Sequence, residues 1–128
     1  MARRRLDGGW GVPDSAWEAD QQDRERGRVR MLNGALEGGM ESWTLPLEQW
    51  QLVRDVILEA IDDGDPDSGV LLKEVVATVQ ARLGISPAFP RGRLTNFTRY
   101  VKVDLEARGV VEVVPRSSPQ RVRRKASG

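Results

Sequence analysis

Apolar side chains recur with the 3.6-residue period of an α-helix in three stretches of this 128-residue chain. The three stretches predict helices over 47–62, 72–83 and 93–108. The apolar positions that share one face are Trp50, Val53, Ile57, Ala60 and Ile61 in the first helix; Leu72, Val75, Val76, Val79 and Leu83 in the second; and Leu94, Phe97, Val101 and Leu105 in the third. Glycine and proline between these stretches end the helices.

The third helix is followed by a β-hairpin pattern. Residues 110–114 and 120–124 alternate or are rich in valine, and the turn-forming stretch 115–119 separates them. A short strand over 69–71 would complete a small sheet with this hairpin. Helix, strand, helix, helix and hairpin is the order of a winged helix-turn-helix. The alternative, a three-helix bundle with a disordered tail, is disfavoured because two β-branched runs flank a turn.

The N-terminal residues have a different composition. Residues 1–28 are rich in Gly, Asp, Gln, Arg and Glu and predict a poorly ordered tail or a frayed helix. Trp10 and Trp17 are the exceptions, and we expect them to dock onto the chain's own domain. Residues 29–32 and 41–45 predict two extended pieces around a turn. The predicted organisation is a tail over 1–28, a winged-helix domain over 29–124, mainly α with a small β-hairpin, and a tail over 125–128.

The chain contains no cysteine and no histidine. Their absence excludes disulfides, cysteine nucleophiles, Ser–His triads and nearly every zinc or iron site. No glycine-rich phosphate loop and no Gly-x-Ser-x-Gly sequence is present. No apolar run approaches the roughly 20 residues of a membrane span. We therefore expect a cytoplasmic protein that is not an enzyme, binds no cofactor or metal and does not contact a membrane.

The net charge of +1 conceals a strong segregation of charge along the chain. Residues 31–90 hold three Lys/Arg and ten Asp/Glu, whereas residues 91–128 hold ten Lys/Arg and three Asp/Glu. Such a basic C-terminal third favours a polyanionic partner, although the two segments could instead attract each other.

Two motifs near the third helix also resemble a known family. Phe89-Pro90 followed by Gly92, and the run Val103-Asp-Leu-Glu-Ala-Arg-Gly-Val110, are similar to the signature of a small uncharacterised bacterial family. The similarity covers roughly 40–124 and departs at Asn96-Phe97, where the family tends to have a tryptophan pair. The resemblance implies a winged-helix fold, and it implies no activity because none is established for that family.

If the third helix packs on its apolar face, the opposite face can contact DNA. That face would carry Thr95, Arg99, Lys102 and Glu106, with Asn96 at one edge. Arg and Asn suit guanine and adenine edges, and basic residues before a helix or on a wing suit phosphates. The full predicted DNA-binding set is Arg91, Arg93, Thr95, Asn96, Arg99, Lys102, Arg116, Arg121, Arg123 and Arg124. The protein would act as a transcription regulator or accessory factor.

Three other interpretations remain open. Pro90-Arg-Gly-Arg93 resembles the core of an AT-hook, but Leu94 stands where the usual second proline would follow, and a surface loop is the favoured explanation of these four residues. Residues 63–74 place carboxylates at several positions of a calcium-binding EF-hand loop, with Ser68 in place of the required glycine. Finally, the third helix or the hairpin edge could form a protein-interaction module, for an acidic protein partner or for self-association, without binding nucleic acid.

Overall fold

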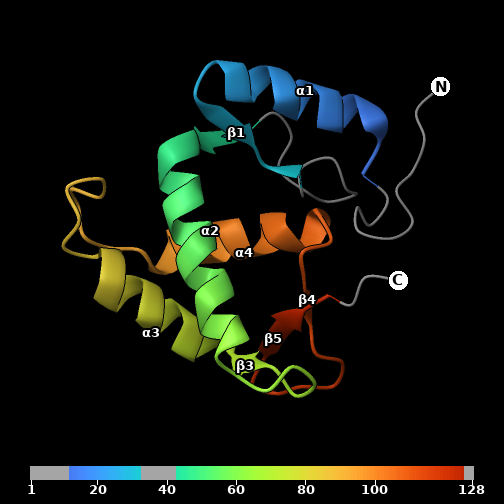
Figure 1. Ribbon diagram of the computed structural model, residues 1–128, viewed down its shortest axis with the longest axis vertical. Helices are drawn as coiled ribbons and strands as arrows, with labels where there is room; N and C mark the ends of the chain where they lie inside the picture. Colours follow the sequence, from blue (N-terminus) through green and yellow to red (C-terminus); the bar gives the residue numbers. More distant parts are fainter. Residues whose placement is uncertain (1–11, 33–42, 126–128) are drawn as a thin grey trace.

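The computed structural model describes residues 12–32 and 43–125 (Figure 1). In chain order the elements are α1 (Asp14–Glu25), β1 (Arg28–Arg30), β2 (Thr44–Pro46), α2 (Leu47–Asp62), β3 (Val70–Leu71), α3 (Leu72–Leu83), α4 (Thr95–Ala107), β4 (Val111–Val113) and β5 (Arg121–Arg124). The predicted class, mainly α with a small β-hairpin, is confirmed. Trp10, the turn expected between the two extended pieces and the last residues of the C-terminal tail lie outside the described residues.

Helices α2, α3 and α4 form the main core. The apolar stripe predicted for the first helix is buried in α2, where Trp50, Val53 and Ile57 are almost inaccessible to solvent. Val75 and Val79 of α3 and Val101 and Leu105 of α4 complete the same cluster. Since burial of each such side chain contributes roughly 1.5–3 kcal/mol, this cluster supplies the main driving force for folding.

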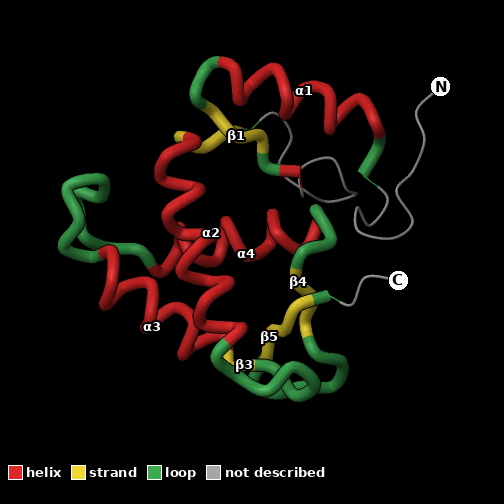
Figure 2. The backbone as a smooth tube through the Cα atoms, in the orientation of Figure 1, coloured by secondary structure: helices red, strands yellow, loops and turns green. Residues whose placement is uncertain are grey.

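A three-stranded antiparallel sheet lies at the C-terminal end of α2 (Figure 2). Its strand order is β3-β5-β4, so β5 is central. Val122 of β5 is opposite both Val70 and Val113, and it is buried against the core. The short strand predicted over 69–71 therefore pairs with the hairpin as expected.

Of the two forms predicted for the N-terminal segment, a poorly ordered tail or a frayed helix, the described part forms a helix. Residues 14–25 form α1, which lies over β1 at the other end of α2 from the three-stranded sheet (Figure 1). The two extended pieces pair as β1 and β2, with Val29 opposite Leu45. Trp17 packs against a small cluster formed by Val12, Leu32 and Ala107, so its predicted docking onto the domain is confirmed.

Polar contacts attach α1 to the domain in addition to the packing of Trp17. Arg108 donates two hydrogen bonds to Asp20 of α1, at 2.9 and 3.1 Å, and one to Asp104 of α4, at 2.8 Å. Burial alone would raise the pKa of Asp20, but hydrogen bonds and the charge of Arg108 outweigh it and hold that pKa below its ordinary value. Asp20 also accepts the backbone N–H of Arg30 at 2.9 Å, which fixes α1 on β1.

In the two described ranges, none of the helices combines the length and the apolar composition needed to cross a lipid bilayer.

Candidate nucleic-acid interface

The exposed face of α4 is displaced from the predicted one. Lys102 was expected on that face, but its residue is only 8% exposed and its Nζ lies 2.9 Å from the Glu106 carboxylate. Helix α4 packs against α2, α3 and β4, and Ala107 at its end is covered by Val12 and Leu32. Its buried arc is therefore wider than its four apolar positions suggest, and it covers the aliphatic stem of Lys102.

The side chains that α4 exposes are Thr95, Asn96, Arg99, Tyr100 and Val103. Asn96, predicted at an edge, thus lies within the exposed face. Tyr100 and Val103 are each 37% exposed and were missed by the sequence reasoning. The Tyr100 ring is held edge-on against Trp43 of the segment before β2, with ring centroids 4.6 Å apart. This face offers an amide, a guanidinium and an apolar edge side by side.

The loop over 84–94, which joins α3 to α4, is firmly anchored. Phe89 is buried and meets Phe97 of α4 edge-to-face, with centroids 5.5 Å apart. Gln80 of α3 donates a hydrogen bond to the carbonyl of Gly92 and accepts the N–H of Leu94 at 2.9 Å. Gln49 of α2 donates to the carbonyl of Ala88 at 2.8 Å. The loop is therefore tied to three helices.

Arg91 and Arg93 are exposed on this loop, as predicted. Within the described residues, neither guanidinium makes a hydrogen bond or an ion pair. The AT-hook interpretation is wrong because the backbone is folded rather than extended: Gly92 has φ +68° and donates to the carbonyl of Phe89 at 2.9 Å. The arginines instead flank a turn immediately before α4, whose first turn contains no acidic residue.

The three predicted arginines of β5 make hydrogen bonds and ion pairs to other parts of the fold. Arg121 donates to the carbonyls of Ser68 and Gly69 at 3.0 and 3.1 Å. Arg123 lies 2.8 Å from the Glu112 carboxylate and also donates to a loop carbonyl. Arg124 forms a two-pronged pair with Asp62, with both distances 3.0 Å. These side chains hold the acidic segment 62–69 against the sheet instead of projecting freely into solvent.

Arg116 is the exception on the hairpin. It lies in the β4–β5 turn with φ +62°, and it is exposed. Among the described residues it has no hydrogen-bonding or ion-pairing partner. In Figure 1 this turn lies at the bottom of the view, well below α4, whereas the loop over 84–94 lies beside the N-terminal end of α4.

The sequence accounts for part of the difference between free and ion-paired basic residues. Residues 75–103 contain five Lys/Arg and no Asp/Glu, and three of the five, Arg91, Arg93 and Arg99, have no partner among the described residues, whereas Arg82 and Lys102 pair with Glu59 and Glu106. The β5 arginines face an acidic segment that folds back onto them. The net charge of the C-terminal third includes both the free basic residues and the paired arginines of β5, so it does not separate them. The acid-free stretch spans most of α3, the connecting loop and most of α4.

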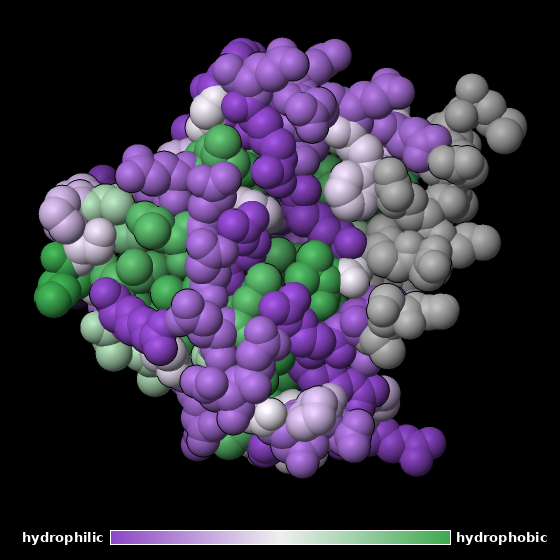
Figure 3. All heavy atoms as spheres, viewed as in Figure 1, coloured by the Kyte–Doolittle hydropathy of each residue, from purple (hydrophilic) through white to green (hydrophobic). Residues whose placement is uncertain are grey.

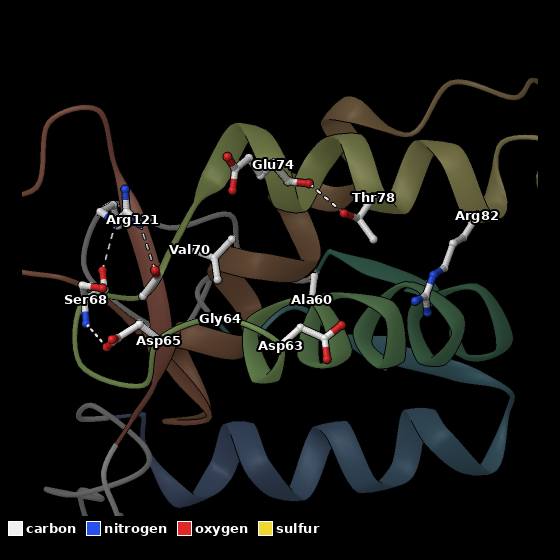
Figure 4. Close-up of a pocket in the computed structure, with 11 residues that line it drawn as sticks. Ala60, Asp63, Gly64, Asp65, Ser68, Val70, Glu74, Thr78, Arg82 and Arg121 are labelled. Carbon is white, nitrogen blue, oxygen red and sulfur yellow. Dashed lines mark hydrogen bonds between the residues drawn. The ribbon is translucent and has the colours of Figure 1, made fainter.

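The acidic segment does not form the calcium loop. Among the described residues, no three acidic side chains lie close enough together to hold a metal ion. Asp63, Asp65 and Glu74 line a cavity of about 380 Å³. Figure 4 shows that their carboxylates point in different directions. Asp65 accepts the N–H groups of Asp67 and Ser68 at 2.7 and 2.9 Å, so its carboxylate closes a polar turn.

On the face seen in Figure 3, apolar side chains reach the surface between α2 and the loop over 84–94, whereas hydrophilic side chains cover α1. Ile85, in this loop, is 92% exposed.

The model of a family of unknown function, DUF6958, matches residues 28–122. The match confirms the predicted similarity to a family without an established activity, and it leaves α1 outside. No match to the chain was found among curated proteins or among solved structures.

Proposed function

This chain belongs to DUF6958, a family of unknown function, and we propose from its own geometry that residues 47–124 form a winged helix-turn-helix that binds duplex DNA. In this proposal α3 and α4 are the helix-turn-helix pair and β4–β5 is the wing. The protein would serve as a transcription regulator or accessory factor in the bacterial cytoplasm, as the family resemblance and the composition suggest.

One observation carries the proposal: the exposed, unpaired basic residues gather on the helix-turn-helix pair. Arg91, Arg93 and Arg99 lie on the connecting loop and α4, inside the stretch of chain that holds no acidic residue. Arg116 on the wing is also unpaired, whereas the arginines of β5 are held inside the fold, as in the pairing of Arg124 with Asp62. Evolution of a solvated surface alone requires no such separation, whereas a phosphate-binding surface does.

The exposed face of α4 also has the side chains that base recognition needs. Arg99 can donate two hydrogen bonds to guanine, and Asn96 can pair with adenine in the major groove. Val103 can contact a thymine methyl group. Arg91 and Arg93 precede the helix, where phosphates are favoured by the helix N-terminus. Lys102 has no role in this interface because it is buried and paired with Glu106.

Fluorescence anisotropy with a labelled random duplex of about 25 base pairs, titrated at several salt concentrations, tests the proposal. Each neutralised phosphate contributes about −0.9 to the slope of log affinity against log salt, so the phosphate contacts of Arg91, Arg93 and Arg116 give about −2.7. Arg99→Ala removes a base contact, so it should weaken binding about tenfold and leave this slope nearly unchanged.

Two variants serve as matched controls for the loss of charge. Arg26→Ala removes an arginine from the far end of α1, and Arg124→Ala removes one that is paired with Asp62; both should bind DNA as the unmodified protein does. If DNA binding is absent at low salt, the proposal fails and the protein-interaction module becomes the better explanation. If Arg124→Ala weakens binding as much as Arg99→Ala, the interface is placed wrongly.

A further inference from the structure

The connecting loop brings an exposed apolar side chain next to the two free arginines. A Cβ on Gly92 would lie 3.0 Å from the carbonyl oxygen of Gly84, so the backbones of these two glycines touch at the neck of the loop. Ile85 follows the first glycine, while Arg91 and Arg93 flank the second. The three exposed side chains therefore start from one short stretch of surface.

This arrangement is held in place without any contribution from Ile85. The neck is closed by Gln80, which bonds both to Gly92 and to the N–H of Leu94, and the middle of the loop is anchored by buried Phe89. Turn hydrogen bonds of 3.0 Å join Ser86 to Leu83 and Phe89 to Ser86. A rigid loop that keeps an isoleucine 92% exposed leaves an apolar surface available to a partner.

The charges around Ile85 indicate what kind of partner fits. The surrounding chain from 75 to 103 carries basic but no acidic residues. Because Arg91 and Arg93 flank Gly92, which lies against the residue before Ile85, a partner that contacts all three side chains presents negative charge beside an apolar strip. A DNA strand has this form, because its phosphates alternate with deoxyribose rings whose C–H groups line the minor-groove edge.

We propose that the loop over 84–94 is a second DNA contact, in which Ile85 packs against deoxyribose and Arg91 and Arg93 bind the neighbouring phosphates. The inference rests on the proposed function and adds to it: the loop, rather than the β5 strand of the wing, supplies the backbone contact beside α4. The arginines of β5 cannot do so without releasing Asp62, Glu112 and the carbonyls they hold.

The test compares three variants in the anisotropy titration. Ile85→Ser should lower the affinity for the random duplex about tenfold at every salt concentration and leave the salt slope unchanged, as expected for loss of an apolar contact of roughly 50–60 Å². Arg91→Gln should reduce the steepness of the salt slope by about 0.9. Ile85→Leu keeps the apolar surface and should bind as the unmodified protein does. Because Ile85 is so exposed, none of these changes should move the thermal midpoint.

The possible outcomes distinguish the proposed loop contact from the proposed DNA-binding function on which it rests. If Arg99→Ala weakens binding while Ile85→Ser and Arg91→Gln do not, the loop contact is refuted and the DNA-binding function stands. If the unmodified protein does not bind the duplex, both are refuted. Binding to phosphatidylserine-containing vesicles that Ile85→Ser abolishes, together with unchanged DNA affinity, would also overturn the loop contact, since the same side chains would then serve a lipid surface.

Discussion

Asp104 is the residue at which separate parts of the fold meet. Its carboxylate accepts the N–H of Leu32, the indole N–H of Trp50 and the Nε–H of Arg108, each at 2.8 Å. Burial raises the pKa of this carboxyl, and the charge of Arg108 opposes the rise. The guanidinium of Arg108 also lies 5.1 Å from the centre of the Trp50 ring. One acidic side chain thus joins the segment after β1 to α2 and α4.

Replacing Asp104 with alanine should be strongly destabilising. The change leaves two buried N–H donors without an acceptor and removes one of the two carboxylates that balance Arg108. Losing one partner of a buried charged pair typically costs about 3–5 kcal/mol. Chemical denaturation followed by tryptophan fluorescence measures the free energy of unfolding directly.

Asp55 provides the comparison for Asp104. It also pairs with an arginine, the adjacent Arg54, but its side chain is mostly exposed. Asp55→Ala should change the free energy of unfolding by less than about 1 kcal/mol. Equal effects of the two substitutions would show that burial of Asp104 does not make its contacts strong.

The sequence predicts which apolar residues of α4 face the core better than it predicts which of its polar residues are exposed. The apolar period identified which residues of α4 face the core, but it could not reveal that Lys102 is covered while Tyr100 is not. That distinction depends on which segments cover α4, and these include Val12 and Leu32, which are distant in sequence. The same holds for the arginines of β5. Nothing near Arg121, Arg123 and Arg124 in the sequence shows that they make hydrogen bonds and ion pairs, because their partners lie in the acidic segment that folds onto them.

At the scale of elements, the loop over 84–94 depends on the conformation of Gly92. Its φ of +68° is one that residues with a Cβ adopt at a cost of about 1–2 kcal/mol, and a Cβ there would also press on the carbonyl of Gly84. Gly92→Ala should therefore distort the neck of the loop, and it should lower both the thermal midpoint and the affinity for DNA. Thermal melting and the anisotropy titration measure the two effects.

Gly27 is a well-matched control for this substitution. It has a similar φ of +75°, but a Cβ there would meet nothing within 4 Å. Gly27→Ala should lower the thermal midpoint through backbone strain alone and leave DNA affinity unchanged. The prediction for the loop is wrong if the two substitutions have the same effects on affinity.

Helices α2 and α3 end where the sequence predicts them to end, because apolar period and glycine or proline punctuation agree there. Helix α1 gave no such signal. The residues it buries most fully are Asp20 and Asp23, and its stability in the fold comes from Arg30 and Arg108. A periodicity search for apolar side chains detects helices that bury a hydrophobic stripe, so a helix attached by ion pairs reads as a polar tail.

At the scale of the whole molecule, the acidic and basic segments partly neutralise each other. Asp62 and the carbonyls of Asp67, Ser68 and Gly69 occupy the arginines of β5. This pairing corresponds to the alternative in which the segregated charges attract one another. It leaves the surplus of unpaired basic residues on the loop over 84–94 and on α4, so a net charge of only +1 is compatible with one strongly basic region.

The family match begins at residue 28, which divides the molecule into a matched domain and α1. Because the main core contains no residue of α1, a chain shortened to 28–128 should still fold. It should be less stable, since removing Asp20 from Arg108 breaks a buried pair; a loss of about 3 kcal/mol would lower the thermal midpoint by roughly 10 °C or more. Calorimetry of the two chains measures this difference.

The stability that α1 contributes should also depend on pH in a defined direction. The pKa of Asp20 is held below its ordinary value of 3.8 in the folded protein, so its pairing stabilises the fold fully above that value and less as the pH falls below it. Asp104 is present in both the full and the shortened chain, and comparing the two isolates the part due to α1. The difference between their thermal midpoints should be constant between about pH 5 and about pH 7, where the Asp20 carboxyl is ionised in both the folded and the unfolded chain. It should narrow below about pH 4, where this carboxyl becomes protonated in the unfolded chain. A difference that grows on acidification would mean that the ion pairs of Asp20 do not attach α1.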